Sequence, residues 1–265
     1  MLSWRPKDRP LPKTPRGYRA YAIGDVHGRL DLLDQLIEAI ERDMESRPPR
    51  KTLLVFLGDL IDRGPDSCGV IERLKNFHHD RMKPYFIAGN HEEVLLRILA
   101  GERHVLADWL KFGGAECLKS YGFDASTLEL TNERASLAAV KKVIPQEHSR
   151  FIASFCDTLS FGDYLFVHAG IRPGVDLSMQ SQTDLRWIRS PFLEDETDHG
   201  RVVVHGHSIS SSVQVRPNRI GIDTGAYRSG QLTALAVDGE THWFLDTGTS
   251  VETGELHHVE EVSAD

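Results

Sequence analysis

Residues 55–64 read VFLGDLIDRG, an apolar run that turns abruptly polar. The apolar half, which extends back to Leu53, predicts a strand buried on both faces, because an uninterrupted apolar run leaves no face for water. Gly58 lets the backbone turn where the run ends, and Asp59, Asp62 and Arg63 follow it. Open α/β sheets bind ligands at the carboxyl edge of their strands. We therefore expect the chemistry of the protein at that edge.

The same pattern of an apolar strand followed by Gly, Asp, His or Asn occurs at four other places. Taken singly, an Asp or His at a strand end is more often a helix cap or a hydrogen-bonded surface residue. Five such ends on neighbouring strands favour a shared metal site, because carboxylate, imidazole and amide groups are metal ligands. The four segments are Gly24–Asp25–Val26–His27–Gly28, Gly89–Asn90–His91–Glu92, His168–Ala169–Gly170 and His205–Gly206–His207.

Composition and charge narrow the class of partner. The chain has 265 residues, 40% of them hydrophobic and 26% charged, with a formal net charge of −8. This is an ordinary globular composition, and it favours neither nucleic acid nor a membrane surface as a partner. Three scattered cysteines without CxxC spacing predict neither a disulfide framework nor a zinc ribbon, so we expect a cytoplasmic protein. The sequence leaves the oligomeric state open.

The pattern of elements predicts an α/β fold with two mixed β-sheets packed face to face and flanked by helices. Residues 30–45 carry apolar side chains at helical spacing, and a second helix is expected after residue 64. Strand and helix thus alternate over the first ninety or so residues, which favours parallel strands. The segment 92–161 is helix-rich and is expected to flank the site. Strands dominate again from Leu165, with a hairpin turn at Asp238–Gly239.

We expect one catalytic domain over residues 18–246, with residues 92–161 as a cap-like insertion. Residues 1–17 form a basic, proline-rich arm without the apolar core of a signal peptide. This arm is expected to pack along the surface, with docking to an acidic partner as the alternative. The acidic tail 247–265 places His257–His258 in a frayed end. The pair His78–His79 is expected to bind no metal.

The ordered motifs GDVHG, GDLIDRG, GNHE, VHAG and GH resemble those of the phosphoprotein-phosphatase branch of the calcineurin-like metallophosphoesterases. They are especially similar to those of bacterial and phage Ser/Thr protein phosphatases, and the resemblance runs from about Tyr18 to about Asp246. It implies two divalent metal ions, with Mn expected and Fe, Zn or Co possible. It also implies attack on a phosphomonoester by hydroxide that bridges the metals.

The resemblance assigns roles residue by residue. Asp59 is expected to bridge the metals, His91 to be the general acid, and Asp62 to orient it. Arg63 and, by analogy, Arg189 are expected to clamp phosphate oxygens, with Arg172 and Arg186 as competing candidates. His205 is an extra histidine beside the ligand set. The expected metal ligands are Asp25, His27 and Asp59 for the first ion and Asp59, Asn90, His168 and His207 for the second.

Three functions remain open at this point. A Ser/Thr phosphoprotein phosphatase is favoured by the complete DRG and NHE motifs, which end in Gly64 and Glu92. A symmetrical dinucleoside-tetraphosphate hydrolase is suggested by Ile222–Asp223–Thr224–Gly225. A binding module on an inactive phosphatase fold should have lost at least one ligand, and the sequence retains all of them. The favoured partner is therefore a phosphorylated protein or peptide.

Overall fold

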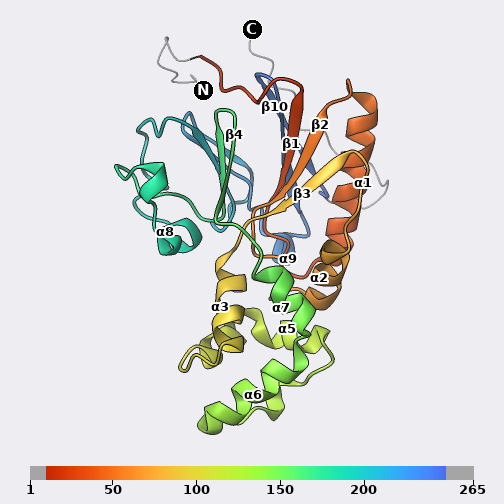
Figure 1. The fold of residues 1–265 in the computed structure, drawn as a ribbon, viewed down its shortest axis with the longest axis vertical. Coiled ribbons are helices and arrows are strands. Elements are labelled where there is room, and N and C mark those ends of the chain that lie inside the picture. Colours follow the sequence, from red (N-terminus) through yellow and green to blue (C-terminus); the bar gives the residue numbers. More distant parts are fainter. Residues whose placement is uncertain (1–9, 249–265) are drawn as a thin grey trace.

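Two five-stranded mixed sheets packed face to face form the centre of the molecule (Figure 1). The structure is a computed structural model, and it describes residues 10–248. The strand order is β10-β9-β1-β2-β3 in the first sheet and β4-β5-β6-β8-β7 in the second. This arrangement confirms the fold class predicted from the sequence.

The first sheet combines a parallel centre with an antiparallel edge. Strand β1 pairs parallel with β2, and β2 pairs parallel with β3, whereas β9 joins β1 and β10 in antiparallel register. Helices α1 (Leu30–Ser46) and α2 (Ser67–Lys75) make the two crossovers, as expected from the helical spacing. The strands are β1 (Tyr18–Ile23), β2 (Lys51–Phe56), β3 (Met82–Phe86), β9 (Thr233–Asp238) and β10 (Thr241–Asp246).

Strand β2 is buried on both faces because its side chains alternate between two cores. Leu54 and Phe56 pack in the core shared with the helices. Leu53, Val55 and Leu57 pack in the core between the two sheets. Successive side chains of a strand point to opposite faces, so one apolar run supplies both cores. The strand end, and with it Asp59, is thereby held from two sides.

The second sheet has three parallel strands flanked by two antiparallel ones. Its first strand, β4, lies inside the segment predicted to be helix-rich up to about Phe161, so that prediction extended too far. The backbone turns at Gly162, which has a φ of 59°, and returns as β5 in a hairpin. The strands are β4 (Thr158–Phe161), β5 (Tyr164–Val167), β6 (Val202–His205), β7 (Gln214–Val215) and β8 (Arg219–Gly221).

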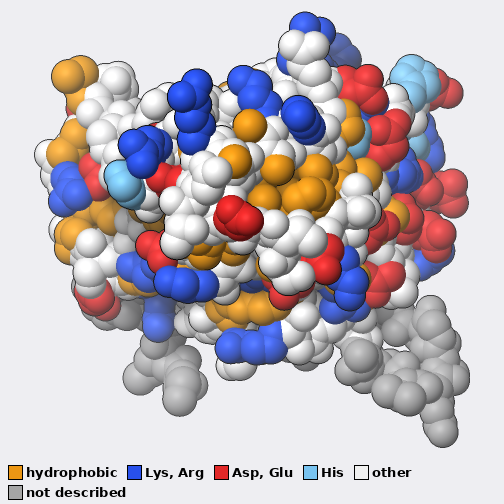
Figure 2. Space-filling view, turned by 90° about the horizontal axis from the view of Figure 1, so that it is seen from below, with side chains coloured by type: hydrophobic (Ala, Val, Ile, Leu, Met, Phe, Trp, Pro, Cys, Tyr) orange, Lys and Arg blue, Asp and Glu red, His pale blue; other side chains and the backbone are white. Residues whose placement is uncertain are grey.

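A helical segment extends below the sheets in Figure 1, starting with α3 directly after Gly89. Seen from below, its face gathers hydrophobic side chains near the centre, with both basic and acidic side chains around them (Figure 2). Two short helices, α8 and α9, lie closer to the sheets. The helices are α3 (Asn90–Leu99), α4 (Leu106–Trp109), the π-helical turn η1 (Leu110–Gly114), α5 (Ala115–Ser120), α6 (Glu133–Val143), α7 (Gln146–Ile152), α8 (Gln182–Trp187) and α9 (Ala226–Ser229).

Residues 10–17 pack against the body of the protein. The backbone N–H of Lys13 donates to Asp163 Oδ2 at 2.9 Å, and that of Thr14 donates to the carbonyl of Gly239 at 2.9 Å. The rest of the basic arm, residues 1–9, and the tail from 249 with His257–His258 lie outside the described residues. Within residues 10–248 no helix is long and apolar enough to cross a membrane.

Candidate active site

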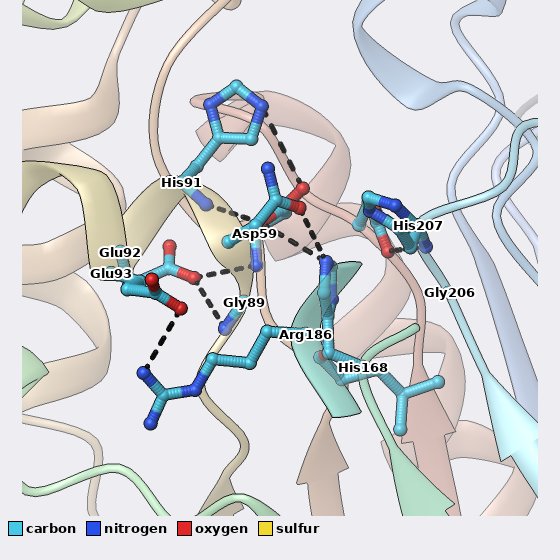
Figure 3. A network of polar contacts seen from close by, with 12 residues as sticks. Asp59, Gly89, His91, Glu92, Glu93, His168, Arg186, Gly206 and His207 are labelled. Atoms are coloured by element: carbon cyan, nitrogen blue, oxygen red, sulfur yellow. Dashed lines mark hydrogen bonds and ion pairs between the residues drawn. The ribbon is translucent and has the colours of Figure 1, made fainter. Parts of the chain in front are cut away.

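The ends of five strands bring most of the expected ligands together. Two clusters of side chains could each hold a metal ion, and within each cluster the ligand atoms lie within 4.8 Å of one another. Asp59 belongs to both clusters. The first consists of His27, Asp59 and His91, and the second of Asp59, His168 and His207. All of these side chains are buried. In Figure 3, Asp59 lies between His91 on one side and His168 and His207 on the other.

The two carboxylate oxygens of Asp59 face different clusters. Oδ2 lies 3.6 Å from His27 Nε2, and Oδ1 lies 3.4 Å from His168 Nε2. Burial opposes ionisation of this carboxyl, but the positive charge that the neighbouring histidines carry when protonated, that of His168 first, outweighs burial and lowers its pKa. An ionised carboxylate with one oxygen toward each cluster is the geometry that a residue shared by two cations requires.

Backbone carbonyls fix which ring nitrogen of each histidine faces the site. His27 Nδ1 lies 2.8 Å from the carbonyl of Ile61, and His168 Nδ1 lies 2.8 Å from that of Leu57. A carbonyl only accepts, so Nδ1 carries the proton in both rings and Nε2 is left with a lone pair. Burial lowers the pKa of His27 and of His207 to about 3, so both imidazoles are neutral.

The described residues leave several of these atoms without a hydrogen-bond partner. Nε2 of His27 and Nε2 of His207 are buried and unpaired within residues 10–248. Asn90 Oδ1 faces His168 Nε2 at 3.0 Å, so two lone pairs point toward each other. Unpaired buried polar atoms are costly, and a divalent cation is a partner that imidazole and amide oxygen atoms can share. The donor set therefore fits metal ions.

Asp25 lies at the centre but in neither cluster. Both of its carboxylate oxygens accept from the backbone N–H of His207 at 3.1 Å. Burial, followed by the charges of Asp223 and Asp59, raises the pKa of Asp25 well above its usual value. A concentration of buried carboxylates of this kind is stabilised by cations.

Asp223 is a buried site residue that the sequence did not assign. Burial raises its pKa to about 6, and its Oδ2 atom has no hydrogen-bond partner among the described residues. The signal was present, since Asp223 follows an apolar strand and precedes Thr224–Gly225, the same pattern as at the other strand ends. In the sequence analysis this segment supports only the resemblance to a dinucleoside-tetraphosphate hydrolase.

His91 occupies the edge of the first cluster with both ring nitrogens engaged. Nδ1 lies 2.6 Å from Asp62 Oδ2, and Nε2 lies 3.0 Å from Arg63 Nη2. Burial opposes the charged imidazolium, but the carboxylates of Asp59 and Asp62 outweigh it and raise the pKa of His91. Asp62 thus stands where a carboxylate that orients His91 is expected.

Glu92 joins the two loops that carry Asp59 and Asn90. Its carboxylate accepts from the backbone N–H groups of Asp59 and Leu60, each at 2.8 Å, and from that of Gly89 at 3.0 Å. Gly89 is required at its position, since a Cβ there would overlap the Asp59 carboxylate. The sequence motif contained Glu92, but its role as a loop clamp appears only in the fold.

The site is built on strained backbone. Six residues other than glycine have positive φ angles within the described chain, and the only one outside the motifs is His104. Each such residue costs on the order of 1–3 kcal/mol, which the surrounding contacts must offset. The five in the motifs are His27 (45°), Asp59 (49°), Asp62 (71°), Arg63 (66°) and His207 (61°).

The candidate arginines differ in their partners. Arg172 is paired with Asp184, and Arg186 is paired with Asp157 and Glu93. Arg189 is exposed, has no ion-pair partner within residues 10–248, and contributes to lowering the pKa of His168 and of His207. Its charge therefore acts on the site.

The other histidines within residues 10–248 belong to neither of the two clusters. His205 Nδ1 faces the carbonyl of Gly206 at 3.1 Å, and its ring packs on Phe192. His79 Nδ1 accepts from the backbone N–H groups of Arg81 and Met82, which gives this member of the His78–His79 pair a structural role. A third possible metal group lies on the helical side, where Lys75 bridges its two glutamates; its members are Glu72, Glu147 and His148.

The chain belongs to the calcineurin-like phosphoesterase family, whose model matches residues 18–236. This confirms the resemblance of the motifs and makes the protein a phosphoesterase, that is, a hydrolase. The family uses divalent metal ions, and the two clusters around Asp59 could bind two of them.

Relatives of the chain carry two kinds of name. It is 29% identical to serine/threonine-protein phosphatase 1 of Salmonella typhimurium over 82% of this chain and 91% of that one. It is 26% identical to the asymmetrical bis(5'-nucleosyl)-tetraphosphatase PrpE of Bacillus thuringiensis over 80% and 88%. A solved structure of a candidate diadenosine tetraphosphatase has a TM-score of 0.61 at 20% identity, with 93% and 95% of the chains covered, which supports the fold.

We predict that Glu92→Gln destabilises the metal-free protein, measured by urea unfolding in EDTA. An amide presents one oxygen where two accept now, and its NH₂ group would face backbone donors. The expected loss is about 1–3 kcal/mol in the free energy of unfolding. Glu116→Gln, an exposed helical position, is the control and should change stability by less than about 0.5 kcal/mol. Equal effects of the two changes would remove Glu92 from the role of loop clamp.

Proposed function

We propose that the protein hydrolyses phosphomonoesters of serine and threonine in proteins or peptides. The observation that carries this proposal is which arginines near the site are paired with carboxylates and which are not. A tetraphosphate chain needs several cations along a groove, but Arg29, Arg172 and Arg186 are each paired with carboxylates. Arg63 and Arg189 have no carboxylate partner within residues 10–248, and two guanidinium groups suffice for one phosphate.

The groove beside the site supports the same choice. It runs past Tyr227 and is lined by three carboxylates, those of Asp31, Asp34 and Asp66, and by one arginine, Arg29. Asp31 and Asp34 are paired with Arg29 and Arg73, so the carboxylate of Asp66 remains to repel a chain of phosphates. A peptide brings few or no negative charges beyond the phosphate itself. An open groove of this kind suits a phosphorylated peptide segment.

In this proposal Asp59 is shared by two divalent ions. Asp25 and His27 complete the set for the first ion, while Asn90, His168 and His207 complete the set for the second. Bound there, the ions supply Lewis acidity toward the phosphoryl group and an activated water. Oxygen and imidazole ligands without thiolate suit manganese, which we propose as the metal. Residues 18–246 would form the catalytic domain, and the helical insertion that begins at residue 92 would end before β4.

His91 is proposed to give a proton to the leaving oxygen. Arg63 has no acceptor atom, so in the structure His91 Nε2 accepts from Arg63 Nη2 and carries no proton. A bound phosphate offers Arg63 a stronger acceptor, which frees Nε2 to hold the proton while Nδ1 donates to Asp62. Protonation matters because serine and threonine alkoxides are poor leaving groups.

A second candidate is an asymmetrical tetraphosphatase, the activity named for PrpE. The alternative expected from the sequence was a symmetrical tetraphosphate hydrolase, whereas the relative's name is that of an asymmetrical one, and we take the asymmetrical reaction as the alternative. Tyr227 favours it, since the ring lies 5.4 Å from that of His27 and 4.9 Å from the Arg63 guanidinium. An aromatic ring beside the site could stack on a nucleotide base.

The experiment is a manganese-supplemented activity panel on the purified protein. We expect kcat/KM on phosphoserine or phosphothreonine peptides to be at least as high as on diadenosine tetraphosphate. The paired arginines and the acidic groove are the reasons. A hundredfold preference for the dinucleotide would overturn the phosphoprotein assignment and leave the fold and the metal clusters intact.

Arg189→Ala should raise the inhibition constant of inorganic phosphate about tenfold or more, because a charge-assisted hydrogen bond to phosphate is lost. Arg172→Ala is the matched control, since its guanidinium is already engaged by Asp184 and should leave the constant within about twofold. The reverse result, with Arg172→Ala causing the loss, would transfer the clamp to Arg172.

A further inference from the structure

The helical segment touches the catalytic loop through a buried indole. Trp109, the last residue of α4, is 2% exposed, and its Nε1–H donates to Asp62 Oδ2 at 2.9 Å. The same oxygen faces His91 Nδ1 at 2.6 Å. One carboxylate oxygen therefore joins a residue of the helical segment to the proposed proton donor.

The hydrogen bond from Trp109 matters because the other carboxylate oxygen of Asp62 has no hydrogen-bond partner in the described part of the chain. Asp62 is 0% exposed, and its Oδ1 atom has no hydrogen-bond partner among residues 10–248. Burial raises the pKa of this carboxyl. Trp109 and His91 thus supply the hydrogen bonds to Oδ2 that hold the carboxylate in position, and the buried thiol of Cys117 also lies against the carboxylate. Without it, the carboxylate could rotate about its side-chain bonds and change the direction of the His91 ring.

The backbone that follows Trp109 is hydrogen-bonded to Arg63, the residue after Asp62 in the catalytic loop. In the π-helical turn the carbonyl of Gly113 accepts from the backbone N–H of Arg63 at 3.2 Å. Gly113 has a φ of 113°, and a Cβ there would overlap the Arg63 backbone. Residues 109–114 therefore contact both Asp62 and Arg63, and both of these have strained positive φ angles.

We propose that the helical segment positions the proton donor, with Trp109 as a positioning residue that acts through Asp62 on His91. This inference rests on the proposed role of His91 as the acid. It gives the insertion a part in the chemical step in addition to any part in substrate access. Trp109 touches neither substrate nor metal ligands in this proposal, so its effect appears in proton transfer alone.

The test is Trp109→Phe, which keeps an aromatic ring and removes the N–H. We expect kcat for a phosphoserine peptide to fall on the order of tenfold, as for loss of a hydrogen bond to a charged group. KM should stay within about twofold. The activity on para-nitrophenyl phosphate, whose leaving group hardly needs a proton, should also stay within about twofold.

The chain offers a matched control in Trp243→Phe. Trp243 is also 2% exposed, and its Nε1–H donates to a buried aspartate, Asp43, at 3.2 Å. The two variants lose the same group from equally buried sites, but Trp243 lies on β10, away from the catalytic loop. Trp243→Phe should leave the ratio of the two activities unchanged.

His91→Asn separates failure of this inference from failure of the acid role. If His91→Asn lowers phosphoserine activity more than para-nitrophenyl phosphate activity and Trp109→Phe does not, His91 is the acid and Trp109 does not position it. If His91→Asn lowers both equally, the acid role itself fails. An equal loss on both substrates for Trp109→Phe would show a merely structural tryptophan and overturn the proposal.

Discussion

The carboxylate of Asp59, buried between two groups of histidines, is the constraint on which the rest of the site depends. A buried ionised group requires partners of opposite charge or hydrogen-bond donors. Its Oδ1 accepts from the backbone N–H of His91 at 3.0 Å, and each of its oxygens faces a different imidazole. The position of Asp59 is fixed by β2, which is packed from both sides. The two sheets thus hold in place the residue that both proposed ions would share.

The arrangement costs stability, and neighbouring contacts offset the cost. Positive φ angles in the loops after β1, β2 and β6 are unfavourable, and so is the grouping of Asp25, Asp59 and Asp223 away from water. Glu92 ties the loop of Asp59 to that of Asn90 through three backbone N–H groups, and the helical segment braces Asp62 and Arg63. Rigid loops of this kind keep ligand atoms in place before a cation arrives, which is the preorganisation a hydrolytic metal site needs.

The sequence predicted those features that depend on local pattern. An apolar strand that ends in Gly and a ligand residue can be recognised at each of the five strand ends, and parallel strands bring such ends to one edge. The pairing of Arg172 and Arg186 with carboxylates could not be predicted, because it depends on how an irregular loop folds back on Asp184 and how Arg186 meets Asp157 and Glu93 of other segments. Trp109 and Asp62 are likewise far apart in sequence. Strand β4 was not predicted because it has only four residues. An alternation of apolar and polar residues over so short a segment cannot be distinguished from a helical pattern.

The measurement that tests the account most directly is the metal content of Asp59→Asn, determined by elemental analysis after manganese loading and gel filtration. The wild-type protein should retain two ions per chain, since each cluster holds one. The variant should retain at most one, because the amide offers one neutral oxygen where a charged carboxylate faces both clusters. Retention of two ions by Asp59→Asn at wild-type affinity would contradict the shared role of Asp59.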